Sequence, residues 1–452
     1  MGDAMTMRLA IADYKRGIPP GLPEHELDMT QEGAFKWPLW LAVRKAIDMI
    51  GLEQEFLQIE AWPGDCLPAP ESAVFMWNGQ KAMRQAMRQE FEAADVPVIC
   101  VEHGWFKRYE YFHFSANGNF GPFAHFKAEL ASRPVTAAME ARAEKIIAKA
   151  WGEVGVHQRT QTIPPERQPQ GAALTEKHRR QMLERHTKKQ LVEVARQTVL
   201  AATFDIDRAT KAQLVAALLE AGFGVEPDAP QGTPKPEPVQ DNRPVLVVLQ
   251  VAGDAQTRGG DGEYTPGDYA QRTVRLLRQA GVRRPITVRV HPGYPPLVEP
   301  GGIDDTGKAL PNKVDPLAQA LSRLEGVSYH EGRTVALAAA LAECAYVVTY
   351  NSNTVHEAMV AGVPCLVTGP HLADQAGVLM QVLSTAGPAG FKAAIETMEE
   401  GWAPEPAGVR DYLARLCDRQ WSLDEIRESG RIRQLLDELQ ELRHGQLQPV
   451  RR

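Results

Sequence analysis

The sequence predicts an α/β protein with two Rossmann-like domains and a small helical module between them. Strands and helices alternate near both ends of the chain, as in doubly wound parallel sheets. The run RPVLVVLQV (243–251) is almost continuously apolar and β-branched, which is typical of a parallel strand covered on both faces. The 452 residues are enough for two or three domains, and a proline-rich stretch at 226–244 separates them.

The first predicted domain spans residues 1–156. Two apolar runs, SAVFMWNG (72–79) and VPVICVEHGW (96–105), end in glycine-containing turns and are predicted to be strands. The segment QKAMRQAMRQEFEAAD between them has helical spacing. Strand, helix and strand within about thirty residues indicate one βαβ unit.

The middle of the chain is predicted to hold a basic helical module at 174–222, followed by a proline-rich linker at 223–244. Between His157 and Lys211 there are 11 Lys and Arg against 6 Asp and Glu, a local charge of +5. The whole chain, by contrast, has a formal net charge of −7, which offers no general attraction to nucleic acid. Any nucleic-acid contact must therefore come from a local patch.

The second predicted Rossmann-like domain spans 245–390 and is followed by C-terminal helices at 391–452. Its predicted strands are 243–251, 285–293, 345–350 and 364–369, and its predicted helices include 265–281, 334–344 and 353–362. In the tail, Ser422 stands three residues before Glu425, the spacing of a helix capping box.

The composition limits the protein class. Hydrophobic residues make up 44% and charged residues 24%, as in ordinary soluble proteins, and no run approaches the length of a membrane span. The five cysteines form no CxxC pair, and the N-terminus lacks a long apolar signal region. We therefore expect a cytoplasmic protein without a zinc cluster, bacterial or from a phage-infected host.

A polar cluster follows the predicted strand at 345–350. It reads NSNTVHEA, and Ser352, Asn353 or Thr354 could cap the helix that follows. Thr354 with Glu357 fits a capping box, and Gly362 and Pro364 would end this short helix. Free N–H groups at such a helix start suit a phosphate. Helix capping alone is the alternative, but it explains neither His356 nor the run of four small polar residues.

The segment SNTVHEAMVAGVPCLVTG resembles the S-x-x-x-x-E-A-x-x-x-G-x-P segment of GT-B glycosyltransferases, closest to the capsule-polysaccharide and Kdo-transferase type. Three further segments agree in order: VLVVLQVAGDAQT with LQ-x-x-x-D-s-Q, ITVRVHPG with K/R-x-HP, and VEHGWFKRYEYFHFSANGNFG with E-x-G-(F/W) followed by G-x-N. The resemblance covers about three quarters of the chain, without the middle module.

The resemblance implies a donor site in the second domain. Glu357 would accept hydrogen bonds from the donor's ribose hydroxyls, and the neighbouring polar residues would hold its phosphate. His356 departs from the family, where a small or apolar residue is more common. The full donor-binding set is Gln250, Asp254, Gln256, Arg289, Ser352, Asn353, Thr354, His356 and Glu357. For the loop of Gln250, Asp254 and Gln256, a solvated turn is the alternative.

The resemblance also implies the catalytic residues Glu102, His103 and His291. Glu102 would be the base for the acceptor hydroxyl, with a structural carboxylate at a strand end as the alternative. His291, with Arg289, would offset the charge of the leaving phosphate, although it could instead be a structural residue before Pro292. The run WFKRYEYFHF would line the acceptor site or belong to the core. No metal and no cofactor are expected beyond the nucleotide sugar, UDP- or CMP-linked, as co-substrate.

The middle module resembles the small helix-extension-helix family (SAP and Rho N-terminal-like), whose members often bind nucleic acid. On this resemblance Lys188, Lys189, Arg208 and Lys211 would contact phosphates. The alternative is a solvated basic helical insertion that packs on the enzyme.

Taken together, the sequence indicates a glycosyltransferase that moves a sugar to a hydroxyl acceptor. Because of the basic module, the interpretation leans to hydroxymethylpyrimidine bases in phage-type DNA as that acceptor. The family resemblance alone favours a surface polysaccharide or lipid-linked glycan as acceptor. A nucleotide-sugar 2-epimerase, which shares the GT-B fold, and a non-catalytic DNA-binding scaffold would also fit the sequence.

Overall fold

The computed structural model describes residues 8–13, 37–58, 72–77, 82–106, 110–116, 121–151, 210–220, 242–251, 264–294, 297–299, 313–332 and 334–443. The chain divides into two compact units, which are described separately. One unit comprises Met1–Pro165 together with Asn242–Arg452, and the other comprises Glu166–Asp241.

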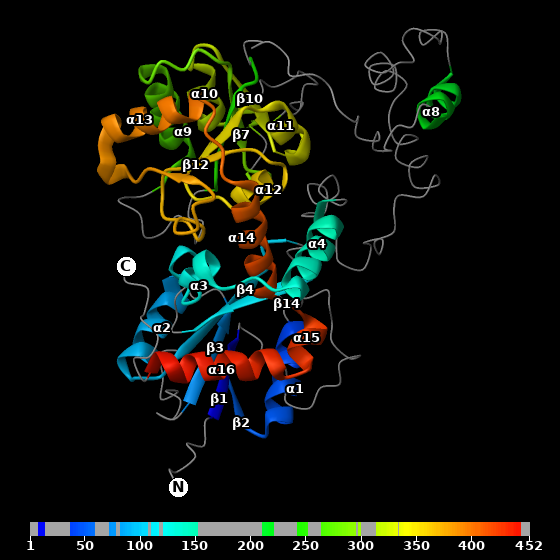
Figure 1. The fold of residues 1–452 in the computed structure, drawn as a ribbon, viewed down its shortest axis with the longest axis vertical. Coiled ribbons are helices and arrows are strands. Elements are labelled where there is room, and N and C mark those ends of the chain that lie inside the picture. Colours follow the sequence, from blue (N-terminus) through cyan, green and yellow to red (C-terminus); the bar gives the residue numbers. More distant parts are fainter. Residues whose placement is uncertain are drawn as a thin grey trace, which may run out of the picture. The chain divides into compact units, whose positions relative to one another are not determined.

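The larger unit contains a first six-stranded sheet, mostly from the N-terminal part of the chain (Figure 1). Its strands are β1 (Arg8–Asp13), β2 (Glu53–Gln58), β3 (Ser72–Trp77), β4 (Val98–His103), β5 (Tyr111–Ser115) and β14 (Gln420–Ser422). They lie in the order β14-β5-β4-β3-β1-β2. The strands β2, β1, β3 and β4 are parallel, and β5 and β14 continue the sheet as antiparallel strands. The predicted βαβ unit is therefore present as β3, α2 and β4.

Four helices belong to the same part of the chain: α1 (Trp37–Ile50), α2 (Ala82–Ala93), α3 (Lys127–Ser132) and α4 (Ala137–Trp151), with a 3₁₀ turn at Gly121–Phe123. On one face of the sheet, side chains of α1 pack with apolar residues of β3, β4 and β5. Phe114 stacks on Trp421 there, with ring centroids 5.0 Å apart. On the other face, α2 covers a smaller cluster around Phe91. Strands β3 and β4 are thus covered on both faces.

The second sheet has six strands that are all parallel. They are β6 (Val245–Val248), β7 (Ile286–Val290), β10 (Val327–Glu331), β11 (Tyr346–Thr349), β12 (Cys365–Val367) and β13 (Met380–Gln381), in the order β10-β7-β6-β11-β12-β13. The chain runs outward from β6 through β7 to β10, and then returns to place β11 on the other side of β6. The strand order therefore reverses between β6 and β11, the position where doubly wound sheets bind ligands.

Helices cover both faces of this sheet. They are α9 (Pro266–Gln279), α10 (Pro316–Ser322), α11 (Leu337–Glu343), α12 (Thr354–Val360) and α13 (Gly387–Glu399), with a 3₁₀ turn at Ser384–Ala386 and a small hairpin of β8 (Val298–Glu299) and β9 (Lys313–Val314). Val245 and Val247 of β6 pack on the side of α9, α10 and α13. Leu246 and Val248 pack on the opposite side with α11 and α12. This alternation is what the continuous apolar run predicts.

The C-terminal segment returns to the first sheet. Helix α14 (Pro406–Asp418) packs against α3 and α4, and β14 then pairs with β5. The last described helices, α15 (Leu423–Arg427) and α16 (Gly430–Arg443), pack against α1, so these red helices lie beside the blue α1 in Figure 1. The fold class is therefore two Rossmann-like domains, as predicted.

The predicted capping box starts α15. The Ser422 hydroxyl accepts a hydrogen bond from the Glu425 N–H at 3.3 Å, and the Glu425 carboxylate accepts one from the Ser422 N–H at 2.8 Å. Glu425 also pairs with Arg142 of α4. The box thus fixes the point at which the chain leaves β14 and enters α15.

Replacing Ser422 by alanine is expected to lower the free energy of unfolding by about 1 kcal/mol, because the Glu425 N–H loses its partner. Ser132→Ala is a matched control, since the exposed Ser132 hydroxyl only donates back to the Ala128 carbonyl within α3. Chemical denaturation of both variants measures the difference. Equal losses in the two variants would contradict the capping role.

In the smaller unit the structure describes residues 210–220, which contain α8 (Lys211–Glu220). Thr210 and Gln213 form a reciprocal cap at its start, with the Thr210 N–H donating to Gln213 Oε1 at 2.8 Å. Leu214 and Ala217 are buried. In the described parts of the whole chain, no helix has the length and apolarity needed to cross a membrane.

Candidate functional site

Gln250 and Asn351 meet where the strand order of the second sheet reverses. Each follows the carboxyl end of its strand, β6 or β11, and both side chains are buried. The Asn351 N–H donates to Gln250 Oε1 at 3.3 Å, and the Gln250 N–H donates to the Tyr264 hydroxyl at 2.9 Å. Gln250 therefore joins the two central strands rather than pointing into solvent as part of a loose turn.

Arg289 lies on β7 beside this position and is 3% exposed. Its guanidinium donates to the Val335 carbonyl at 2.8 Å and to the Gly332 carbonyl at 3.2 Å. Burial lowers the pKa of Arg289 to about 10, and the nearby Glu357 opposes this change. Arg289 thus remains a cation at neutral pH, in a position where charge is costly to bury.

Glu357 extends from α12 near Arg289. Burial raises the pKa of its carboxyl to about 7, although the Arg289 charge acts to lower it. None of the described residues forms a hydrogen bond with the Glu357 carboxylate. A ligand that donates hydrogen bonds there would stabilise the ionised form.

The polar residues before α12 differ from the predicted capping arrangement. The helix starts at Thr354 with Asn353 as its N-cap residue, so Thr354 cannot cap the helix with Glu357 as its box partner. Instead the Ser352 hydroxyl accepts from the Thr354 N–H at 3.2 Å and donates to the Thr354 hydroxyl at 3.1 Å. The predicted end is confirmed, because Gly362 has the positive φ of +68° that terminates such helices.

His356 lies in the core rather than beside Glu357. It is 1% exposed, and its Nε2 atom lies 3.0 Å from the Tyr412 hydroxyl of α14. Burial, followed by the charge of His371, lowers its pKa well below the ordinary value. A neutral His356 therefore connects α12 to α14.

Three other predicted donor-site or catalytic residues have different outcomes. His291 follows β7, and its Nδ1 atom accepts a hydrogen bond from the Gly293 N–H at 2.9 Å, as in a turn. Asp254 and Gln256 lie outside the described residues. Their predicted roles stay predictions.

Glu102 and His103 end β4 in the first sheet. Glu102 is partly exposed, and its carboxylate accepts a hydrogen bond from the His103 N–H at 3.1 Å. His103 is mostly buried, and its ring meets the Trp77 ring edge to face with centroids 4.8 Å apart. The two predicted catalytic residues thus have different surroundings.

His113 is a candidate residue that the sequence did not indicate. It lies directly opposite Glu102 in the β4–β5 ladder, so the two side chains share a face of the sheet. His113 Nδ1 lies 2.8 Å from the His103 carbonyl oxygen, and burial lowers the pKa of His113 to about 4. The imidazole is therefore neutral at pH 7, and its Nδ1–H donates to that carbonyl oxygen.

Trp105 joins the two groups of candidate residues. Its ring stacks on His113 at 4.3 Å and meets His356 of α12 at 6.4 Å. The Trp105 N–H donates to Gln420 Oε1 at 2.9 Å, which fixes the loop after β4. The end of β4 therefore contacts the helix that carries Glu357. The aromatic run belongs in part to the core, as Phe112 and Phe114 show.

A buried ion pair reinforces this contact. Lys127 Nζ of α3 lies 2.7 Å from Asp374 Oδ2, and both side chains are largely buried. Asp374 follows His371, which is also buried and hydrogen-bonded to the Ser352 backbone. The segment after β12 thus connects the first domain to the polar residues before α12.

Three tyrosines surround the ends of β6 and β11. Tyr264, Tyr269 and Tyr350 have ring centroids 5.5 to 6.1 Å apart. Gly369 leaves room for them, because a Cβ atom there would lie 2.8 Å from the Tyr350 ring. Tyr264 and Tyr269 were not predicted as site residues, since tyrosines at helix starts carry no distinctive sequence signal.

The predicted nucleic-acid contacts can be followed at one position. Lys188, Lys189 and Arg208 lie outside the described residues. Lys211 is the first residue of α8 and is exposed. In the described ranges, no group of three or more His, Cys, Asp or Glu side chains is arranged to hold a metal ion, and independence from metal stays a prediction.

No protein-family model and no curated protein matches the chain. Among solved structures, the KpsC beta Kdo 2,4 transferase of Thermosulfurimonas dismutans is 13% identical, with 79% of this chain and 87% of that chain covered and a TM-score of 0.33. A UDP-forming trehalose-phosphate synthase from Burkholderia xenovorans is 11% identical (91% and 79% covered, TM-score 0.31). The UDP-GlcNAc 2-epimerase of Neisseria meningitidis is 10% identical (95% and 100% covered, TM-score 0.29). Scores this low carry no inference about function, and the two sheets themselves define the fold class.

Proposed function

We propose that the chain is a nucleotide-sugar-dependent glycosyltransferase of the GT-B class. The observation that carries the proposal is the buried Arg289 with the partly buried Glu357 near it, beside the point where the second sheet reverses its strand order. A buried cation near a carboxyl group without a hydrogen bond to the described residues suits a ligand that has both phosphate and hydroxyl groups. A nucleotide sugar, UDP- or CMP-linked, has both.

In this proposal the second domain binds the donor. Ribose hydroxyls donate to the Glu357 carboxylate, which favours its ionised form. The hydroxyls of Ser352 and Thr354, with the remaining N–H groups of Arg289, hold the phosphate. Arg289 offsets the negative charge that grows on the leaving phosphate as the glycosidic bond breaks. The tyrosines Tyr264 and Tyr350 provide an aromatic surface near the nucleobase of the donor.

The first domain provides the catalytic base that deprotonates the acceptor. The acceptor oxygen bonds to the anomeric carbon, the bond from that carbon to the phosphate oxygen breaks, and the electron pair leaves with the nucleotide. Glu102 takes the proton of the acceptor hydroxyl. His113 lies on the same face as Glu102 and, through the contact of its Nδ1 atom with the His103 carbonyl oxygen, holds the end of β4 where Glu102 lies.

For the acceptor we propose hydroxymethylpyrimidine bases in DNA, which present a primary hydroxyl. This choice rests on the local charge of +5 between His157 and Lys211 in a chain of net charge −7. A surface polysaccharide or lipid-linked glycan is the competing acceptor.

The test is a panel of nucleotide sugars incubated with hydroxymethylated DNA and with glycan acceptors, read by mass spectrometry. A mass increase of one sugar on DNA supports the whole proposal, while an increase only on a glycan replaces the DNA acceptor. Conversion of a free nucleotide sugar to its epimer without an acceptor would indicate a 2-epimerase.

Glu102→Gln is expected to lower kcat at least ~100-fold with a nearly unchanged donor KM. Full activity in that variant would remove Glu102 from the mechanism.

A further inference from the structure

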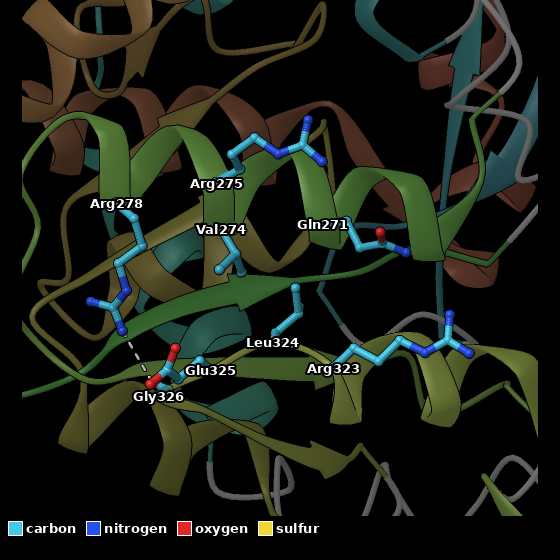
Figure 2. Close-up of a pocket in the computed structure, with 8 residues that line it drawn as sticks. All are labelled: Gln271, Val274, Arg275, Arg278, Arg323, Leu324, Glu325 and Gly326. Carbon is cyan, nitrogen blue, oxygen red and sulfur yellow. Dashed lines mark hydrogen bonds between the residues drawn. The ribbon is translucent and has the colours of Figure 1, made fainter.

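A groove with three arginines lies on the second sheet's side away from the candidate donor site. It has a volume of about 490 Å³ and is formed by one flank of α9 and the turn after α10 (Figure 2). Its lining residues are Gln271, Val274, Arg275, Arg278, Arg323, Leu324, Glu325 and Gly326. Gly326 directly precedes β10, and Arg278 donates to the carbonyls of Val282 and Arg284 just before β7. The groove therefore lies at the amino ends of β7 and β10, whereas the donor site lies at the carboxyl ends.

Among the described residues, no acidic side chain forms an ion pair with the three arginines of this groove. Arg275 and Arg323 are exposed and form no ion pair in the described parts of the chain. Arg278 is held by three carbonyl oxygens, including that of Gly326 at 3.1 Å, and none of these partners carries a charge. Of the eight lining residues, only Glu325 is acidic. The groove is therefore positive in a protein that is negative overall.

The arrangement of the side chains fits an anion with an apolar part. Gln271 and Arg275 extend from α9 and Arg323 from the opposite wall, while Val274 and Leu324 lie between them (Figure 2). Planar guanidinium groups bind phosphate through paired hydrogen bonds. The rigidly held Arg278 adds a fixed positive charge at one end.

We propose that this groove is a second binding site, which takes a phosphate-bearing ligand. Its volume is that of a site for a small organic molecule, within the usual range of about 300 to 1,000 Å³. The phosphate contacts Arg275 and Arg323, and the apolar part of the ligand lies on Val274 and Leu324. The proposal does not depend on glycosyl transfer, because it uses no residue of the donor site.

The experiment uses hydrogen–deuterium exchange on the full chain with UMP as the probe. UMP is expected to protect peptides that cover 271–279 and 322–328. The double variant Arg275→Gln/Arg323→Gln should remove this protection and weaken binding at this site at least ~10-fold, because two charge-assisted hydrogen bonds are lost. Glu357→Ala should leave it unchanged, which separates this site from the donor site.

The control variant Arg272→Gln/Arg283→Gln removes two exposed charges outside the groove and should keep the protection. A second arm replaces UMP with a 20-base-pair DNA duplex. Protection by UMP identifies a small organic phosphate as the ligand, and protection by the duplex alone identifies a phosphodiester backbone. Protection confined to 349–357, no protection with either probe, or an equal loss in the control variant would each overturn the proposal.

Discussion

The variant Glu357→Gln is expected to be more stable than the native protein at pH 8 and yet to lose donor binding. The folded protein raises the pKa of the Glu357 carboxyl to about 7, from 4.5 in the unfolded chain. Below pH 4.5 the carboxyl is protonated in both states, and its ionisation does not affect stability. As the pH rises from 4.5 to 7, the unfolded chain loses this proton first, so the free energy of unfolding falls.

The size of this effect follows from the shift in pKa. At 1.36 kcal/mol for each pKa unit, ionised Glu357 destabilises the folded protein by about 3 kcal/mol above pH 7. Glutamine imitates the protonated side chain and therefore removes the destabilisation that the ionised carboxylate causes. Urea denaturation should therefore show a gain of about 3 kcal/mol for Glu357→Gln at pH 8 and almost none at pH 4.5. A gain that is equal at both pH values would contradict the assignment.

The same substitution should abolish the contacts proposed for the ribose. A carboxylate accepts hydrogen bonds from two hydroxyl groups, whereas the glutamine NH₂ group cannot accept one. Donor affinity measured by calorimetry should fall at least ~100-fold at pH 8. Glu343→Gln, at the exposed end of α11, is the matched control and should change neither property. Unchanged affinity in Glu357→Gln would remove Glu357 from the donor site.

Native donor binding should also depend on pH in a defined direction. Because the ligand needs the ionised carboxylate, affinity should rise as the pH increases through about 7, with uptake of a proton on release of the ligand. A site with this property gives up stability in the empty protein in return for binding, which is common where function needs a buried charge.

The elements that could be predicted from sequence are those with strong local patterns. The apolar runs of β6 and β11, the alternating residues of β7 and the amphipathic α9 have the periods of their structures, and Gly362 ends α12 as expected. The strand β14 could not be predicted. It has three residues, and its pairing with β5 depends on a contact more than 300 residues away in the chain. Short strands of this kind form because of tertiary packing rather than local preference.

The sequence could place Gln250 and Arg289 at the ends of their strands and Glu357 in the helix after β11, and the structure has them there, while their donor-binding roles stay predictions. His113 could not be predicted, because its importance comes from its register opposite Glu102, which no local pattern reveals. The sequence assigns His356 to the donor set as part of the polar cluster NSNTVHEA, with its role there left open. Successive helix residues point about 100° apart, however, and His356 consequently packs on Tyr412.

Replacing Arg419 by methionine is expected to destabilise the chain more than any other substitution proposed above. Arg419, just after α14, is 3% exposed and donates to both Glu438 oxygens of α16 at 2.8 and 3.0 Å. It also pairs with Glu129 of α3. Removing the guanidinium leaves Glu438 buried and negatively charged, and the loss should be about 3 to 5 kcal/mol at pH 7.

The pH dependence separates this mechanism from simple loss of packing. Burial alone would raise the pKa of Glu438, but the hydrogen bond from His125 and the charge of Arg419 lower it to about 2. The pair therefore stabilises the protein fully above pH 4.5, and this contribution is lost as the pH falls toward 2. The deficit of Arg419→Met should accordingly shrink on acidification.

Two further variants separate charge from packing. Arg427→Met removes the half-buried partner of the exposed Asp424, so loss of this ion pair should cost at most about 1 kcal/mol. Adding Glu438→Gln to Arg419→Met should recover part of the lost stability, because the buried negative charge disappears with it. A double variant less stable than Arg419→Met would show that the remaining contacts of the Glu438 carboxylate with His125 and Gln434 outweigh the cost of its unpaired charge. Recovery of stability in the double variant would establish that the ion pair of Arg419 and Glu438 holds the C-terminal helix to the first domain. It would also show that the protein tolerates the loss of both charges better than the loss of one.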